Sequence, residues 1–183
     1  ANKTFDDFED GNYDSDPNWD ELSGYPSAAS IVDGIRGDHA LKMQDGSSTT
    51  FLQLNITQKS YTNLSFYAKF EASGGTANGY PAVKFYDGNG RSGNTAVASV
   101  IMQPDGDLAF AGQGNTVGIN LDHGTAYKFS IQNIDYANDS AELHVHDLSG
   151  SLVAKNESVN MASGGDTLGS ISVADSSNSG TSV

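Results

Sequence analysis

Short runs in which apolar and polar residues alternate recur along the whole chain, and they constrain its fold more than any other feature. In the clearest run, residues 63–72, Phe66 and Phe70 fall on one face of an extended chain, whereas Tyr67 and Lys69 fall on the other. Runs of this period, bounded by Gly, Asn and Asp, are typical of all-β sandwiches and barrels. Helical periodicity is nearly absent, so we expect an all-β protein.

Further runs of the same kind predict about ten short strands in all. The segment 95–112 is predicted to form a hairpin, because Pro104, Asp105 and Gly106 provide a tight turn between two apolar runs. The other predicted strands lie within residues 39–45, 49–56, 81–86, 126–135, 141–159 and 168–175. With one apolar face each, these strands predict two antiparallel sheets packed face to face about 10 Å apart, a two-sheet antiparallel β-sandwich.

Length and charge narrow the range of function classes. Residues 1–183 fit one domain, with no internal repeat and no linker long enough to divide them. The sequence has no cysteine, no retained signal peptide and no apolar run long enough for a membrane span. Its 23 acidic residues against nine Lys plus Arg give a net charge of -14. A field of that sign repels phosphate, so we expect neither nucleic acid nor an anionic membrane as a partner.

The distribution of charge also indicates an environment. Most of the acidic residues are Asp, and they are spread along the chain. Together with scarce Lys and abundant Gly, Ala, Ser and Thr, this composition is typical of proteins adapted to high salt. At molar salt the Debye length falls to about 3 Å, which screens the self-repulsion of such a surface. Five sequons permit N-glycosylation of an exported protein, although chance also produces them in a chain rich in Asn and Ser. They begin at Asn2, Asn55, Asn63, Asn138 and Asn156.

The segment 4–24 is rich in carboxylates but also carries Phe5 and Phe8, which are apolar anchors that a solvated acidic tail lacks. We therefore expect a strand followed by a loop. In that loop Asp14 and Asp16 alternate with other residues, and oxygen ligands at this spacing suit calcium. The segment does not match the helix-loop-helix calcium loop. The competing interpretation is a salt-adapted acidic surface.

The order of these signals resembles a known family. The run FDDFEDG, with a Trp shortly after it, is followed by GDHALKM, YKFSIQNID and AELHVHDLSGSLV. This order is similar to the concanavalin A-like lectin/glucanase jelly roll, and more narrowly to laminin G-like and carbohydrate-binding-module domains of secreted bacterial and archaeal proteins. The resemblance covers nearly the whole chain and implies a jelly-roll sandwich. In such domains the opening Glu often helps to hold a structural calcium, which implies Glu9 as a ligand, with Asp7 and Asp10 beside it.

The resemblance also implies a departure at the C-terminus. Domains of this type commonly close with a strand that bears an Asp pair and follows a turn like SSNSGTSV, whereas this sequence stops at Val183. We therefore expect a sheet without its closing strand. Three explanations remain open: the chain continues, the strand is dispensable, or a neighbouring subunit donates a strand to the open edge.

Catalysis finds little support in the residues. Glycosidases of the family carry two Glu flanking an Asp on one strand, and none of the five Glu here lies in that pattern. Alternation places Glu142, His144 and His146 on one strand face, where they would bind zinc only with a further ligand from elsewhere. Solvated strand-face histidines are the competing interpretation. We expect no catalytic residue, and a lyase using Tyr, His or Lys is the enzymatic alternative.

Sugar binding requires aromatic rings that stack on pyranose faces, with polar groups alongside for the hydroxyls. The outward-pointing residues Tyr67, Lys69, Lys84 and Tyr86 lie on two predicted strands that we expect to be neighbours, where they would form a small platform. Trp19 would line its rim from a loop. The competing interpretation is structural, with Trp19 closing one end of the core and the strand tyrosines reflecting β propensity.

The sequence as a whole favours a non-catalytic carbohydrate-binding or adhesion domain of an exported or cell-surface protein, with a glycan or polysaccharide as its partner and a structural calcium. The alternative is a structural subunit of an extracellular filament, surface layer or virion, completed by a strand from a neighbouring subunit. That alternative requires self-association through an open sheet edge near Phe5 to Phe8.

Overall fold

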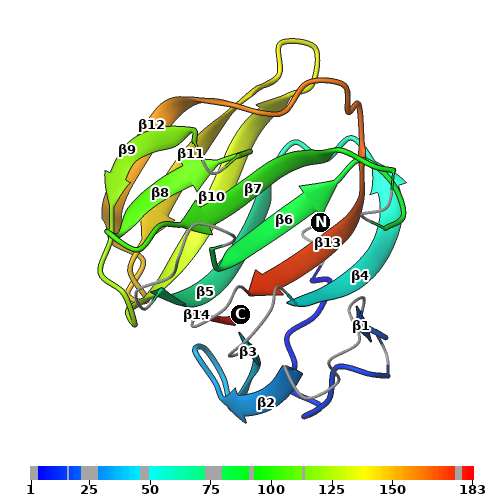
Figure 1. Ribbon diagram of the computed structural model, residues 1–183, viewed down its shortest axis with the longest axis vertical. Coiled ribbons are helices and arrows are strands. Elements are labelled where there is room, and N and C mark those ends of the chain that lie inside the picture. The colour runs from blue at the N-terminus through cyan, green and yellow to red at the C-terminus, as the bar shows by residue number, and fades with distance from the viewer. Residues whose placement is uncertain are drawn as a thin grey trace.

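The computed structural model of the protein is an all-β sandwich (Figure 1). Its described residues contain no helix, and thus no helix able to span a membrane. The structure describes residues 4–15, 17–21, 29–45, 50–72, 80–90, 93–112, 114–175 and 179–183. Asn2 and Asp16, which the sequence analysis considered, lie outside the described residues.

Two sheets make up the described residues, with seven strands in each. Sheet A faces the viewer in Figure 1 and has the order β1-β4-β13-β6-β7-β8-β9. Its strands are β1 (Asp20–Glu21), β4 (Thr50–Lys59), β6 (Ala82–Tyr86), β7 (Ala96–Met102), β8 (Asp107–Phe110), β9 (Thr116–Asn120) and β13 (Leu168–Asp175).

Sheet B lies behind sheet A and has the order β12-β11-β10-β5-β14-β3-β2. All strand pairings among the described residues are antiparallel, as the sequence predicts. Its strands are β2 (Ala29–Asp33), β3 (His39–Asp45), β5 (Leu64–Ala72), β10 (Ala126–Asp135), β11 (Ser140–His146), β12 (Leu152–Asn160) and β14 (Ser179–Ser182).

The core forms where the apolar faces of the two sheets meet. Phe129 of β10 is fully buried and stacks on Phe66 of β5, with 5.2 Å between ring centroids. Phe66 in turn contacts Phe85 of the opposite sheet at 6.0 Å. Each such side chain contributes about 1.5–3 kcal/mol when buried, so the period-two pattern fixes which face of every strand points inward. The predicted alternation on residues 63–72 is confirmed.

The opening segment differs from its prediction, because residues 4–15 contain no strand. The carboxylate of Asp6 accepts the backbone N–H of Phe8 at 2.8 Å, and that of Asp10 accepts the N–H of Asn12 at 3.1 Å. Such local bonds compete with ladder pairing, and Phe8 adopts a positive φ of 59 that a strand does not allow. Phe8 is nevertheless buried, and Phe5 is partly buried against the core. The strand edge that the filament alternative requires near Phe5 to Phe8 is therefore not formed.

The C-terminal residues also differ from their prediction as a turn. Strand β14 lies between β3 and β5 and pairs with both, so that Thr181 is opposite Met43 on one side and Phe70 on the other. Val183 and Leu41 exchange two backbone hydrogen bonds of 2.9 Å. Sheet B therefore has no gap at this position in the described residues. The residues of β14 are Ser, Gly, Thr and Ser, so no alternation of apolar and polar residues predicts this strand.

Candidate functional site

The four strand residues of the predicted platform lie in different sheets, which corrects the expectation that their strands are neighbours. Tyr67 and Lys69 lie on β5 of sheet B, whereas Lys84 and Tyr86 lie on β6 of sheet A. The chain passes from one sheet to the other between these two strands. Strands β5 and β6 follow one another along the chain but are not paired in a sheet. The four residues therefore do not form the predicted platform.

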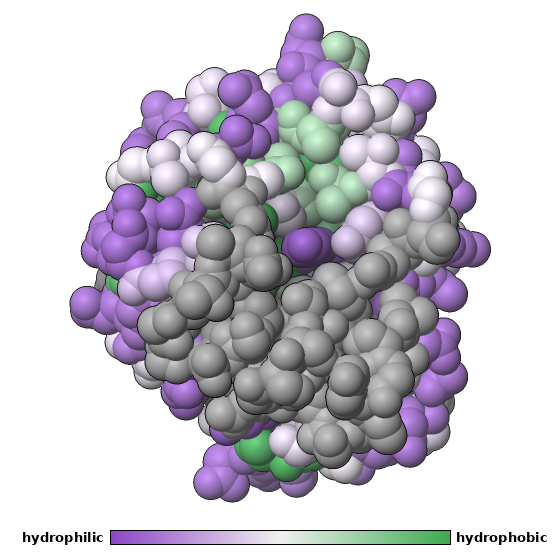
Figure 2. Space-filling view, in the orientation of Figure 1, coloured by the Kyte–Doolittle hydropathy of each residue, from purple (hydrophilic) through white to green (hydrophobic). Residues whose placement is uncertain are grey.

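The outer face of sheet A carries a row of polar residues. The strand register places Gln53, Ser172, Lys84 and Ser99 side by side across β4, β13, β6 and β7. All but Lys84 are buried, and the Oγ of Ser172 has no hydrogen-bond partner among the described residues. Figure 2 shows this side of the molecule, with apolar residues gathered near the upper centre and hydrophilic ones around them. Tyr86 is likewise buried, so it presents no exposed ring for stacking on a sugar.

Trp19 closes the core and does not line a binding rim. Only 5% of it is exposed, its ring lies 5.8 Å from that of Phe8, and its Nε1 donates a hydrogen bond of 2.6 Å to the Asp6 carboxylate. Burial raises the pKa of Asp6, and the N–H donors of Phe8 and Trp19 oppose that rise. Trp19 is thus buried against the core, as the structural interpretation predicts, and its ring offers no exposed face for stacking on a sugar.

Tyr67 of sheet B points outward and is held by two cations. The Nη1 of Arg36 donates a hydrogen bond of 3.0 Å to the Tyr67 hydroxyl, and the guanidinium carbon lies 4.9 Å from the ring centroid. The Nζ of Lys128 lies 6.0 Å from the same centroid. Cation–π contacts of this kind are worth about 0.5–1 kcal/mol at exposed sites. Tyr67 is half-buried and lies on an accessible face, unlike Tyr86.

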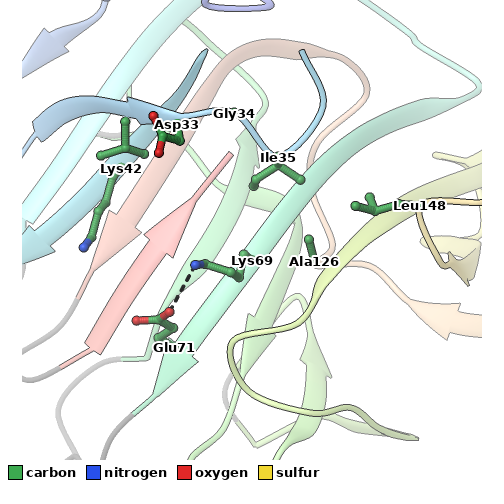
Figure 3. A pocket seen from close by; sticks show the side chains of 9 residues that line it. Asp33, Gly34, Ile35, Lys42, Lys69, Glu71, Ala126 and Leu148 are labelled. Atoms are coloured by element: carbon green, nitrogen blue, oxygen red, sulfur yellow. Dashed lines mark ion pairs between the residues drawn. The ribbon is translucent and has the colours of Figure 1, made fainter. Parts of the chain in front are cut away.

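A pocket of about 410 Å³ lies on the same face as Tyr67. Figure 3 shows charged side chains on one side of it and apolar ones on the other, and a dashed line marks the ion pair of 3.3 Å between Lys69 and Glu71. Its lining residues are Val32, Asp33, Gly34, Ile35, Lys42, Lys69, Glu71, Ala126 and Leu148. Such a combination of apolar surface with a few charged groups suits a small polar ligand that also has apolar faces.

The turn between β2 and β3 forms one wall of this pocket. The N–H of Gly34 donates to the carbonyl of Asp38 at 3.1 Å, and a Cβ at Gly34 would lie 2.3 Å from the Gly37 carbonyl oxygen. Only glycine therefore fits at position 34. This tight turn carries Ile35 into the pocket and Arg36 over the ring of Tyr67.

Glu9 anchors that turn from outside. Its carboxylate accepts the backbone N–H of Asp38 at 3.0 Å and that of His39 at 3.2 Å. These hydrogen bonds lower the pKa of Glu9, and the bond from Asp38 has the largest effect. Gly37 packs so closely that an added Cβ would lie 2.3 Å from Oε1 of Glu9. The groups facing Glu9 are thus N–H donors, which satisfy an anion and do not bind a cation.

The predicted calcium ligands that lie within the described residues do not gather as a metal site. The resemblance assigned Glu9, Asp7 and Asp10, and the alternating pattern assigned Asp14 and Asp16. In the part of the chain that the structure describes, no three His, Cys, Asp or Glu side chains gather as metal ligands do. Asp7 and Asp10 instead accept nearby backbone N–H groups. Calcium binding stays a prediction, which a chelation experiment tests.

Glu142, His144 and His146 lie on one face of β11, as alternation predicts. The carboxylate of Glu142 accepts from the Nδ2 of Asn133 at 2.8 Å and lies 3.0 Å from Nε2 of His144. These two contacts lower the pKa of Glu142. The rings of His144 and His146 are 6.4 Å apart, and no third ligand joins them among the described residues, so the zinc alternative gains no support.

The described sequons differ in accessibility. Asn55, Asn63 and Asn138 are exposed, whereas Asn156 is half-buried and its Nδ2 donates a hydrogen bond of 2.9 Å to the carbonyl of Val117. A glycan on Asn156 would displace this contact between β12 and β9. Glycosylation at the other three described positions is compatible with the fold and stays a prediction.

Comparison with known proteins finds likeness in structure alone. No family model matches the sequence, and no curated protein matches it. A sialidase matches with a TM-score of 0.64 at 16% identity, over 98% of this chain and 17% of that one. Lectin II from Ulex europaeus matches with a TM-score of 0.55 at 12% identity, over 92% of this chain and 91% of that one. The fold is a lectin-type jelly roll.

A third solved structure bears on calcium. The VIP36 exoplasmic/lumenal domain, solved in its Ca2+/Man3GlcNAc-bound form, matches with a TM-score of 0.51 at 6% identity, over 90% of this chain and 83% of that one. Lectins of this fold bind sugars, and enzymes also occur among the similar structures. The chain spans about a sixth of the sialidase, so what that enzyme does describes a much longer protein. At these identities the likeness shows the fold only.

The sequence reasoning missed three residues of the sheet B face. Lys42 and Lys128 occupy outward positions of the predicted strands 39–45 and 126–135, so alternation contained a signal for both. Arg36 lies in a turn, where no periodicity indicates direction. Its place over Tyr67 follows only from the folded structure.

Proposed function

We propose that this domain binds carbohydrate in the pocket on the outer face of sheet B and does not transform it. The observation that carries the proposal is the pocket itself, in which the apolar side chains of Ile35 and Leu148 face charged groups that include Lys69 and Glu71. A sugar ring has apolar C–H faces and hydroxyl edges, and this pocket offers a surface for each. The lectin-type fold supports a sugar-binding role.

The chemistry of the pocket favours binding over catalysis. Its two carboxylates are Asp33 and Glu71, and Glu71 is paired with Lys69. A glycosidase requires two carboxylates that flank the bond to be broken, one of them protonated. No histidine lines the pocket. Incubation with polysaccharides and assay for reducing ends or unsaturated uronides tests this part, and turnover abolished by Lys69→Ala would contradict it.

Binding itself is tested with two exposed leucines. Leu148 lines the pocket and is 51% exposed, whereas Leu152 is 52% exposed and does not line it. We expect Leu148→Ser to weaken retardation in polysaccharide-containing gels about fivefold, because about 1 kcal/mol of apolar contact with the sugar is lost. Leu152→Ser removes the same apolar surface from β12, opposite His146 and outside the pocket. Equal effects of both variants, or no retardation of the parent protein by any glycan, would contradict the proposal.

The location of the protein and the role of calcium are proposed from the same observations. We propose an exported protein, because the sequons at Asn55, Asn63 and Asn138 are exposed and the partner is a polysaccharide. Calcium has no place in the proposed binding, because the pocket contains Lys42 and Lys69 beside its carboxylates. Analysis of the native protein for attached glycans tests the first point.

A further inference from the structure

Cations are concentrated on one face of a strongly acidic molecule. The sequence has only nine Lys plus Arg against 23 acidic residues. Five of the nine lie on the outer face of sheet B or directly over it. They are Arg36, Lys42, Lys69, Lys128 and Lys155. We call these five residues the cationic strip.

The strand register places the strip in a stepped row, because Lys69 is opposite Ala126 and Lys128 lies two residues further along β10. Ser182 of β14 lies between Lys42 and Lys69, which continue the row from β3 to β5. Lys128 of β10 lies opposite Tyr67 of β5, on which Arg36 is stacked. From β3 to β12 the row crosses five strand spacings, about 24 Å at the usual interstrand distance. That length accommodates several sugar units in a chain.

The far end of the strip continues across β11 and β12. Lys128 is opposite His146, and His144 is opposite Lys155. His144 contacts Glu142, and Lys155 is paired with Glu157. The histidines add N–H donors to this part of the face, because neutral imidazole also carries one donor.

Three members of the strip have no carboxylate partner in the part of the chain that the structure describes. Among the described residues, the ion pairs on this face join Lys69 to Glu71, His144 to Glu142 and Lys155 to Glu157. Arg36, Lys42 and Lys128 make none. Arg36 uses one N–H on the Tyr67 hydroxyl, which leaves further donors of its planar fork for a ligand. Such a fork matches the two oxygens of a carboxylate or sulfate group.

We infer that the ligand of the sheet B face is an anionic polysaccharide, with carboxylate or sulfate groups that bind Arg36, Lys42 and Lys128. This inference rests on the proposed function and specifies its ligand. The unpaired cations supply the attraction, and the pocket beside Lys69 holds one sugar ring. Direct contacts of about 2.7–2.9 Å are shorter than the Debye length of about 3 Å in molar salt, so they persist where long-range attraction is screened.

Polysaccharides that differ in charge alone provide the test. We propose affinity electrophoresis in gels that contain carboxymethyl cellulose or hydroxyethyl cellulose, polygalacturonate or methyl-esterified pectin, and dextran sulfate or dextran. We expect retardation by charged members of these pairs and much less by their uncharged partners. If neutral members retard the protein equally, the anionic class is wrong while the proposed function stands. If no member retards it, both are wrong.

Matched variants locate the contact. Lys128→Gln and Lys42→Gln are each expected to weaken retardation by the charged polymer about three- to fivefold, with unchanged thermal unfolding. Lys59→Gln is the control, because it removes the same charge from the exposed end of β4 in sheet A. An equal effect of Lys59→Gln would show general electrostatic attraction and overturn the assignment to the strip.

The same experiment tests two other polyanions as ligands of the cationic strip. Retardation by single-stranded DNA as strong as by the charged polysaccharides would show that the strip does not select sugars and would overturn the inference. Sedimentation that reveals a dimer, dissociated by Lys128→Gln, together with no retardation by charged polysaccharides, would identify a second acidic copy of the chain as the anion. Monomers that prefer charged polysaccharides over DNA would support the inference.

Discussion

At the scale of single residues, the burial of an aromatic ring decides whether it can contact a ligand. Tyr67 and Tyr86 both occupy outward positions by alternation, yet Tyr67 lies on an accessible face and Tyr86 is buried. Alternation tells which side of a strand a residue occupies but not what covers that side. For Trp19 the deciding contact is with Asp6, thirteen residues away, and no local pattern indicates it.

Trp19 provides a prediction about stability at this scale. Trp19→Phe keeps an aromatic ring against Phe8 but removes the donor to the half-buried Asp6 carboxylate. We expect a loss of about 1–3 kcal/mol in the free energy of unfolding, measured by urea denaturation, because a polar group loses its partner. Glycan retardation should not change. Lost retardation at unchanged stability would return Trp19 to the binding site.

At the scale of elements, the predictions succeed where an apolar face is buried against the other sheet. The strands β5, β10, β11 and β13 follow the expected ranges closely, because each presents a regular apolar face. The segment that forms β9 was missed, since Gly118 with a positive φ of 70 and exposed neighbours weaken the pattern. The order of strands in a jelly roll is set by crossovers between sheets, which a local pattern does not encode.

The turn between β2 and β3 gives a prediction about Glu9. Glu9→Gln replaces a charged acceptor of two backbone N–H groups by a weaker neutral one. We expect a lower midpoint of thermal unfolding and weaker glycan binding, because this turn carries Ile35 and Arg36. The matched control is Asp166→Asn, which removes an exposed carboxylate just before β13 of sheet A, away from the strip.

Chelation distinguishes this role from calcium binding. If Glu9 anchors the turn through N–H groups alone, EDTA leaves the unfolding midpoint of the parent protein unchanged, and Glu9→Gln lowers it equally with and without EDTA. If Glu9 binds calcium, EDTA lowers the midpoint of the parent protein and has no further effect on the variant. Differential scanning fluorimetry separates the two outcomes.

The loss of stability at low pH provides a second test of the role of Glu9 in this turn. The pKa of Glu9 lies below its ordinary 4.5 in the folded protein, so the folded state binds the proton more weakly than the unfolded state. Its contribution to stability is therefore present above about pH 4.5 and is lost as the pH falls through the folded-state pKa. Glu9→Gln should reduce the loss of stability in that range. Parallel pH profiles of variant and parent would contradict the assignment.

At the scale of the whole molecule, charge dominates behaviour. A net charge of -14 on 183 residues destabilises the compact state through self-repulsion. We expect the midpoint of thermal unfolding to rise between about 0.01 M and 1 M NaCl, as the Debye length falls from about 30 Å to 3 Å. The rise should shrink near pH 4.3, where the sequence carries little net charge. An unchanged midpoint at neutral pH would contradict adaptation to high salt.

The polar groups on the two outer faces of the sandwich differ in their accessibility to a ligand. Sheet A buries its polar row around Ser172, whereas sheet B exposes the pocket and the cationic strip beside Tyr67. Backbone amide shifts in a 1H–15N NMR titration with an acidic oligosaccharide compare the two faces directly. We predict the largest shifts at Tyr67, Lys69 and Lys128, with little change in β13. Shifts confined to β6 and β13 would contradict the central claim that sheet B binds the ligand.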